Sequence, residues 1–234
     1  MEEQREKQRA MVILAHPDDP EFFCGGTVGR WVQEGREIVY VLATRGERGS
    51  DDPQTDPQEL ARRREAEQRA AAAILGVRQV VFLDYPDGSV VVSLELRRDL
   101  ARQIRLWRPD VVITCDPARH SEYYLSHPDH RAVAEAALDA VFPDARNPLQ
   151  FPELLAEGLQ PHRVMEVYIA GAAAPDTEVD VSASFELKLA ALRQHRSQIS
   201  DFQALEERLR QRHRVEDENG ARYVERFRRI ELSR

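Results

Sequence analysis

The sequence predicts an α/β fold with a mostly parallel sheet, and three features of the 234 residues support this class. Short apolar runs rich in β-branched residues recur along the chain, as expected of buried strands. Longer helical patterns separate these runs, which is the rhythm of strand-helix-strand units. Polar residues gather directly after the runs, where the carboxyl ends of parallel strands open onto a ligand-binding crevice.

The elements follow from this rhythm in chain order. Five strands are expected, at residues 11–15, 38–43, 80–83, 111–115 and 164–170. Four helices are expected between them, at residues 26–33, 56–75, 94–107 and 128–141. Right-handed crossovers would place these helices on the two faces of the sheet. Two more helices are expected over residues 182–214, one at 182–199 and one at 201–214.

The composition indicates one globular unit. The chain is 42% hydrophobic and 32% charged, which is typical of a globular domain with a well-charged surface. No seam divides it, so we expect a single domain over residues 1–234, with a polar N-terminal tail at residues 1–8. The net charge of −8, with arginines interspersed among glutamates, argues against a nucleic-acid partner.

The cysteines and the N-terminus bear on the compartment. Cys24 and Cys115 lie far apart, so neither a disulfide framework nor a thiolate metal cluster is expected. Residues 1–8 lack the apolar region of a signal peptide, and no apolar run has the length of a membrane span. We therefore expect a cytoplasmic protein with no membrane partner.

The first unusual motif follows the first expected strand. Residues 12–21 read VILAHPDDPE, so an apolar run ends in His16, Asp18 and Asp19. Imidazole and carboxylate groups bind Zn²⁺ and similar metals, and a catalytic zinc usually keeps three protein ligands. The aspartates could instead only cap the next helix. However, adjacent carboxylates at a partly buried helix start repel each other unless a cation offsets their charge. The motif predicts a metal site with His16 and either aspartate as ligands.

A second motif, residues 126–130 (SHPDH), lies at the start of a helical pattern. Pro128 favours the first helical turn, which places His127 at the helix entrance. The two histidines could be surface residues, with Asp129 only stabilising the helix N-terminus. Because the carboxyl ends of parallel strands meet at one edge, His130 can instead lie beside His16 and supply a third ligand.

These motifs resemble those of the LmbE-like, or PIG-L, deacetylases, which remove the acetyl group from N-acetylglucosamine units. Residues 15–21 resemble the family pattern A-H-P-D-D-x-E, and residues 127–130 resemble H-P-D-H. Other similar segments are TRGE at 44–47, Arg64 with Glu67, PDG at 86–88, and the C-terminal residues Lys188, His195, Ser197 and Gln198. The resemblance covers most of the chain.

The resemblance implies how the metal site works. His16, Asp19 and His130 would bind one Zn²⁺ per chain. Asp18 would be the general base that activates the water on the metal, since zinc lowers the pKa of its water towards about 7.

The resemblance also implies roles around the metal. His127 would stabilise the oxyanion or protonate the leaving amine, with Asp129 orienting its ring. Arg64 and Asp87 would hold sugar hydroxyls, although Arg64 could instead pair with Glu67 along its helix.

Two departures concern the substrate. Leu125 stands where the mycothiol-pathway deacetylases have a tyrosine, and Tyr123 or Tyr124 would have to replace it. Residues 145–162, rich in proline, leucine and glutamine, are expected to form a variable lid or interface loop.

The sequence as a whole predicts a Rossmann-like, three-layer α/β hydrolase with its active site at the carboxyl ends of the strands. It would act as a zinc-dependent N-deacetylase on an N-acetylglucosamine-type sugar or conjugate. An amidase acting on another N-acylated molecule, such as a thiol conjugate or an antibiotic, is one alternative. A non-catalytic nucleotide-binding module is another, although the Gly25-Gly26 pair lacks the spacing of a phosphate loop. Another divalent transition metal could replace zinc, and the charged helices leave a homo-oligomer open.

Overall fold

The computed structural model describes residues 8–118, 125–218 and 220–232. Most of the expected N-terminal tail, together with Tyr123 and Tyr124, lies outside the described residues.

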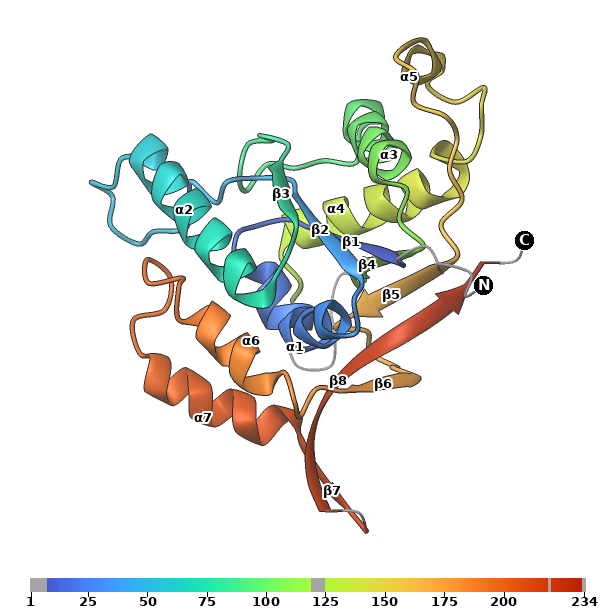
Figure 1. Cartoon of the computed structure of the whole chain (residues 1–234). Coiled ribbons are helices and arrows are strands. Elements are labelled where there is room, and N and C mark those ends of the chain that lie inside the picture. The colour runs from blue at the N-terminus through green and yellow to red at the C-terminus, as the bar shows by residue number, and fades with distance from the viewer. Residues whose placement is uncertain (1–7, 119–124, 219, 233–234) are drawn as a thin grey trace.

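One sheet runs through the molecule in the order β3-β2-β1-β4-β5-β8-β6, with β7 paired to β8 (Figure 1). Its strands are β1 (Arg9–Leu14), β2 (Glu37–Leu42), β3 (Gln79–Phe82), β4 (Val111–Cys115), β5 (Glu166–Ala170), β6 (Thr177–Asp180), β7 (Arg214–Asp217) and β8 (Gly220–Glu231). The strands from β3 to β5 in this order are parallel, whereas β8 is antiparallel to β5, β6 and β7. The expected α/β class with a mostly parallel sheet is confirmed.

The central strand β1 is buried on both faces, which explains its continuous apolar run. Val12 and Leu14 pack in one core cluster, whereas Met11 and Ile13 pack in the other. Burying each of these side chains is worth about 1.5–3 kcal/mol. The first cluster lies under α1 (Asp19–Gln33), α2 (Pro57–Leu75), α6 (Phe185–Leu192) and α7 (Phe202–His213), and the second under α3 (Leu94–Trp107), α4 (Pro128–Asp139) and α5 (Pro152–Ala156). The sheet thus lies between two helical layers.

The first helix departs from the expected range of 26–33. It begins at Asp19 and is kinked at Cys24, whose backbone is non-helical (φ −149°, ψ 17°). The glycines after the kink serve close packing, because a Cβ on Gly26 would lie 2.8 Å from the Cβ of Val181. Close packing against Val181 therefore explains Gly26 without a phosphate-binding loop.

The C-terminal part departs most from expectation. The helix expected over 182–199 is shorter, since α6 ends at Leu192, while α7 matches the second expected helix closely. Strands β6, β7 and β8 were not expected. In β8, Val224 and Phe227 are buried while Arg226 and Arg228 are exposed, so charged residues interrupt the apolar run.

Residues 145–162 lie at the amino ends of the strands. Helix α4 begins at the carboxyl ends of the strands and runs back toward their amino ends. The π-helical turn Ala140–Asp144 follows it there. The ring Nε2 of His162 lies 2.7 Å from the carbonyl oxygen of Pro109, just before β4. The buried guanidinium of Arg105 donates to four carbonyl oxygens in this region, those of Asp144, Ala145, Asn147 and Gln150. A lid over a site at the carboxyl ends is therefore wrong for this segment, and the alternative of an interface loop stays a prediction.

Candidate active site

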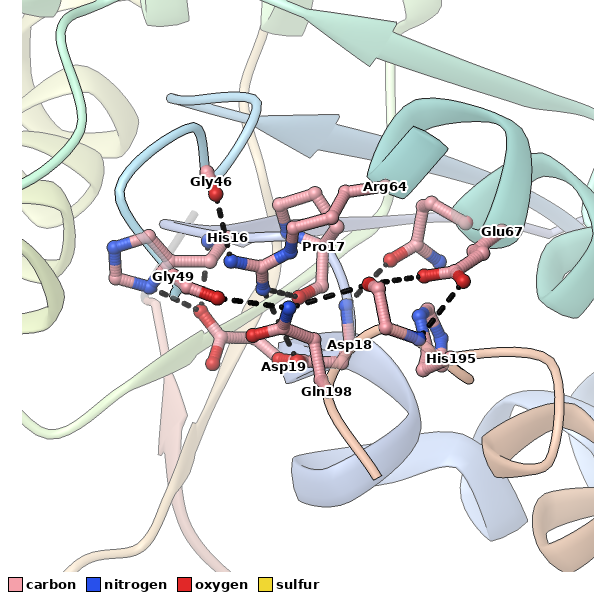
Figure 2. A network of polar contacts seen from close by, with 12 residues as sticks. His16, Pro17, Asp18, Asp19, Gly46, Gly49, Arg64, Glu67, His195 and Gln198 are labelled. Atoms are coloured by element: carbon pink, nitrogen blue, oxygen red, sulfur yellow. Dashed lines mark hydrogen bonds and ion pairs between the residues drawn. The ribbon is translucent and has the colours of Figure 1, made fainter. Parts of the chain in front are cut away.

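The turn after β1 has an unusual backbone at Asp18, with φ of 89°. Aspartate tolerates this region better than most residues. The N–H of Asp18 donates to Oε1 of Gln68 at 2.8 Å. Figure 2 shows the guanidinium of Arg64 turned toward the same turn, where it donates to the carbonyl of Pro17 at 2.7 Å and to Oδ2 of Asp18 at 3.1 Å. Two side chains of α2 therefore hold Asp18 in place.

Three predicted metal ligands converge at this turn. Nε2 of His130 lies 3.1 Å from Oδ1 of Asp19 and 3.2 Å from Nδ1 of His16. Nδ1 of His16 lies 3.4 Å from Oδ2 of Asp19. One donor atom from each residue lies within 4.8 Å of the others. Two imidazoles and a carboxylate facing one point form a suitable donor set for a divalent transition metal.

The charges around His16 call for a cation. Its Nε2 lies 3.1 Å from Oδ1 of Asp87 and 3.3 Å from Oδ2 of Asp129, so together with Asp19 three carboxylates surround one buried ring. Burial lowers the pKa of His16, but the contacts with Asp129, Asp19 and Asp87 outweigh it and raise the pKa to about 12. This cluster is stabilised by added positive charge, which a divalent ion supplies.

Asp18 lies beside the donor set with a different electrostatic character. Burial and the negative charge of Asp19 raise the pKa of its carboxyl to about 7, against the opposing effect of Arg64. A carboxylate of this kind can accept a proton at neutral pH and release it again.

His127 and Asp129 both make contacts with backbone N–H groups. His127 is the N-cap of α4, and its Nδ1 accepts the backbone N–H of Asp129 at 3.2 Å. The Asp129 carboxylate accepts the N–H groups of Gly88 at 2.6 Å and Val90 at 3.2 Å. The backbone of Asp129 therefore holds the ring of His127, and orientation of this ring by the Asp129 carboxylate stays a prediction.

Arg64 and Asp87 are both buried, at 5% exposure. Arg64 also donates to the carbonyl of Gly46 at 2.9 Å. The alternative pairing of Arg64 with Glu67 is wrong, since the Glu67 carboxylate accepts the N–H and hydroxyl of Ser197. Asp87 Oδ2 accepts the N–H of Arg48 at 2.8 Å, and the contact with His16 helps to lower the pKa of Asp87 to about 2, although burial opposes this.

The sequence interpretation missed Gln68, which connects Asp18 to a buried polar network. Its Nε2 donates to both oxygens of Glu21, at 2.9 and 3.0 Å, and Nε2 of His195 lies 3.1 Å from the same carboxylate. Gln68 lies four residues after Arg64, so helical spacing on one face was the available signal.

A second buried network stabilises the kink of α1. The ammonium of Lys188 lies 2.6 Å from Oε1 of Glu225 and donates to the carbonyl of Phe22 at 2.9 Å. The carboxylate of Glu225 accepts the N–H groups of Gly26 at 3.0 Å and Thr27 at 2.7 Å. These are the backbone groups that a break in a helix leaves without partners.

A cavity of about 260 Å³, the active-site cavity, opens over the donor set. Its lining includes His16, Arg48, Arg64, Asp87, His127 and His130. Of the side chains expected to act on a substrate, His127, Arg64 and Asp87 thus face one common space.

Comparison with known proteins identifies the relatives of this chain. The model of the PIG-L family, described as GlcNAc-PI de-N-acetylase, matches residues 11–141. A diacetylchitobiose deacetylase from Thermococcus kodakarensis is 34% identical over 83% of this chain and 71% of its own length. A probable N-acetyl-alpha-D-glucosaminyl L-malate deacetylase 2 from Bacillus anthracis is 27% identical over 84% of each chain.

The solved structures include an N,N'-diacetylchitobiose deacetylase from Pyrococcus horikoshii, complexed with its inhibitor MPG. It superposes with a TM-score of 0.88 at 33% identity and covers 97% of this chain and 85% of the other. With the family model matched across both motifs, this chain belongs to the PIG-L family.

Proposed function

We propose that this chain is a zinc-dependent N-deacetylase that hydrolyses the acetamide of an N-acetylglucosamine-type sugar. The observation that carries the proposal is the convergence of His16, Asp19 and His130 at the turn that holds Asp18. The names of the relatives support the acetamide of an amino sugar as the reacting group.

The donor set suits zinc and defines what the metal contributes. His16, Asp19 and His130 would hold the ion, which polarises the amide carbonyl and makes a water molecule more acidic. Every other step is assigned to side chains of this chain.

Asp18 is assigned the proton transfers. Its carboxylate takes a proton from the attacking water and later returns it to the nitrogen of the leaving amine. Arg64, 3.1 Å from Oδ2 of Asp18, keeps the carboxylate oriented during both transfers.

His127 is assigned to the oxyanion. Because its Nδ1 accepts the N–H of Asp129, the hydrogen of the neutral ring is assigned to Nε2. Burial lowers the pKa of His127, so the neutral ring is favoured. Its Nε2–H then donates to the oxygen that becomes negative when water adds to the carbonyl. Acetate and a free amino sugar result.

Sugar binding by Arg64 and Asp87 remains a prediction. Both line the active-site cavity, but both also bind protein groups there, so they can serve the sugar only with their remaining hydrogen-bonding capacity.

The cytoplasm remains the predicted compartment. Both cysteines are buried free thiols, which agrees with a reducing environment. In the part of the chain that the structure describes, no helix has both the length and the apolar character needed to cross a bilayer.

The test measures metal content and amine release on one preparation. We expect about one zinc per chain and release of free amine from N-acetylglucosamine or its conjugates. Chelation should abolish the release, and added zinc should restore it, whereas added magnesium should not, because the two histidines favour transition metals. A metal-free protein that releases no amine after zinc is added would contradict the proposal and favour a binding module.

A further inference from the structure

Two residues of the sequence motifs, Glu21 and His195, take no part in the mechanism above, although both are buried. Glu21 is 0% exposed and His195 is 1% exposed. They come from distant segments, since Glu21 lies in α1 and His195 follows α6. Oε2 of Glu21 lies 3.1 Å from Nε2 of His195. A buried carboxylate is costly unless its oxygens accept hydrogen bonds, so the further partners of Glu21 indicate what it does.

A further partner of Glu21 is the side-chain amide of Gln68, which is also 0% exposed. Nε2 of Gln68 donates to both carboxylate oxygens, at 2.9 and 3.0 Å. A carboxylate accepts hydrogen bonds and cannot donate them, so it attracts the nitrogen end of the amide and repels the oxygen end. His195 donates from Nε2 to the same carboxylate and helps to hold it in place. Glu21 and His195 therefore determine which end of the Gln68 amide faces away from them.

The oxygen end of the Gln68 amide contacts the backbone at Asp18. Oε1 accepts the N–H of Asp18 at 2.8 Å, while Arg64 donates to the carbonyl of Pro17 at 2.7 Å. This N–H and this carbonyl belong to one planar peptide unit, in which they point in opposite directions. A flip of the unit would bring the carbonyl oxygen of Pro17 toward Oε1 of Gln68, where two acceptors repel each other. The peptide unit is thus held from both sides in one orientation.

The backbone of Asp18 depends on contacts of this kind. Its φ of 89° and ψ of −31° lie in a region that residues other than glycine rarely adopt. Such a conformation persists only where the surrounding structure imposes it. Since φ is the rotation about the bond from the nitrogen to the Cα of Asp18, the held peptide unit also sets the direction of the Asp18 side chain.

The metal ligand Asp19 has a separate support. Its Oδ2 accepts the N–H of His16 at 2.8 Å, and its Oδ1 lies 3.1 Å from Nε2 of His130. None of these contacts involves Gln68. Loss of the Gln68 contact should therefore displace Asp18 and leave the donor set in place.

We propose that Gln68 is a positioning residue for Asp18, and that Glu21 and His195 orient its amide so that the oxygen faces the N–H of Asp18. This inference rests on the proposed function, in which Asp18 transfers the proton. It gives the segment after α6 a role in catalysis, because His195 acts on Asp18 through Glu21 and Gln68.

The first experiment measures kcat, KM and zinc content of Gln68→Met, with N-acetylglucosamine, or the conjugate of it that the wild type deacetylates, as substrate. Methionine has a similar length but offers no oxygen to the N–H of Asp18. We expect kcat to fall by about 10–100-fold, since a displacement of about 1 Å can cost about 10²-fold in rate. KM should stay within about twofold of the wild type. Zinc should stay near one per chain, because the donor set is unchanged.

Ser184→Ala is the matched control. Ser184 is also 0% exposed, and its hydroxyl donates to the carbonyl of Gly26 in α1 at 2.6 Å. This variant loses a buried hydrogen bond beside the same helix, without contact to Gln68 or Asp18. It should lower the midpoint of thermal unfolding and leave kcat unchanged, when both variants are assayed well below their midpoints.

A second set of variants tests the orientation of the amide and keeps a polar side chain of similar size at both positions. Glu21→Gln alone places two amides face to face, and Gln68→Glu alone places two carboxylates face to face. In the double variant, the carboxylate at position 68 can accept the N–H of Asp18. The amide at position 21 can donate to that carboxylate and accept from His195. The double variant should therefore exceed either single variant in kcat by at least about threefold.

The outcomes separate this inference from the proposed function. If the wild type binds zinc but releases no amine from any N-acetylated sugar, the proposed function fails, and the inference fails with it. If the wild type is active and Gln68→Met keeps its kcat, only the inference fails. Loss of zinc from Gln68→Met would assign Gln68 to the metal ligands instead of Asp18. Should Gln68→Met not fold, a double variant no faster than the single variants would overturn the inference.

Discussion

Two buried charged clusters flank the kinked helix α1, and they differ in how their charge is balanced. In the structural cluster, Lys188 and Glu225 are 0% and 1% exposed, and each meets the other and nearby backbone groups. In the active-site cluster, the carboxylates of Asp19, Asp87 and Asp129 crowd around His16. A buried cluster whose positive and negative charges balance stabilises the fold. A buried cluster with excess negative charge is suited to bind a cation.

The largest effect is expected from removing a donor of the active-site cluster. His130→Ala should lower zinc from about one per chain to near zero and abolish amine release, because two donors hold zinc poorly. Metal analysis after dialysis and an amine assay measure both quantities. The midpoint of thermal unfolding, taken without metal, serves as the control. A variant that retains both zinc and activity would exclude His130 as a ligand.

The next effect separates Asp18 from the metal ligands. Asp18→Asn should retain zinc and lower kcat by about 10²–10⁴-fold, since the amide cannot accept the proton. Asparagine also tolerates the positive φ at this position, so the backbone should persist. Steady-state kinetics on samples of matched zinc content measures this loss of kcat. Activity above about a tenth of wild type would remove Asp18 from the assigned role.

The structural cluster predicts the opposite behaviour. Lys188→Met should lower the free energy of unfolding by about 3–5 kcal/mol, because Glu225 would stay buried without its partner. Urea unfolding measures this loss. The double variant Lys188→Met with Glu225→Gln should recover much of it, since the glutamine oxygen can still accept a backbone N–H. A single variant as stable as wild type would show that the charges are not coupled.

The smallest effect is expected from His213, which interacts with Lys188 and Glu225 and should make the folded protein less stable in acid. Burial and the charge of Lys188 lower the pKa of His213 from 6.5 to about 4, although Glu225 opposes them. Below pH 6.5 the unfolded chain therefore binds a proton that the folded chain does not. Stability should fall by about 1 kcal/mol per pH unit from about 6.5 to about 4, and stay level in this respect above 6.5.

Urea unfolding at pH 7 and pH 5 tests this prediction. His213→Gln should be less sensitive to acid than the wild type over this interval. Equal slopes in the two proteins would assign the sensitivity to other groups.

Sequence patterns predicted the part of the molecule that depends on parallel strands. The runs at β1 and β4 and the motifs after them placed His16 and His130 at one edge, because parallel strands end together. The convergence of His16 and His130 followed from that rule, whereas the choice of Asp19 over Asp18 as a ligand came from the family resemblance.

The other features of the fold and the site depend on contacts between distant residues, which no local sequence pattern reveals. Charged residues interrupt the apolar run of β8, so the strand that brings Glu225 to α1 could not be recognised. α6 ends at Leu192 and lets the chain turn so that His195 reaches Glu21. The direction of the Asp129 carboxylate is set by backbone N–H groups of the loop after β3, which sequence does not reveal.

The kink of α1 has a consequence for the order in which the protein is made. The turn with His16 and Asp19 is synthesised well before strand β8. The carboxylate that caps the second half of α1 arrives 199 positions after Gly26. Until β8 docks, the amides of Gly26 and Thr27 lack this partner and Lys188 lacks its counter-charge. The nascent chain thus gains full support for α1, which begins at the turn of His16 and Asp19, only after β8 has left the ribosome.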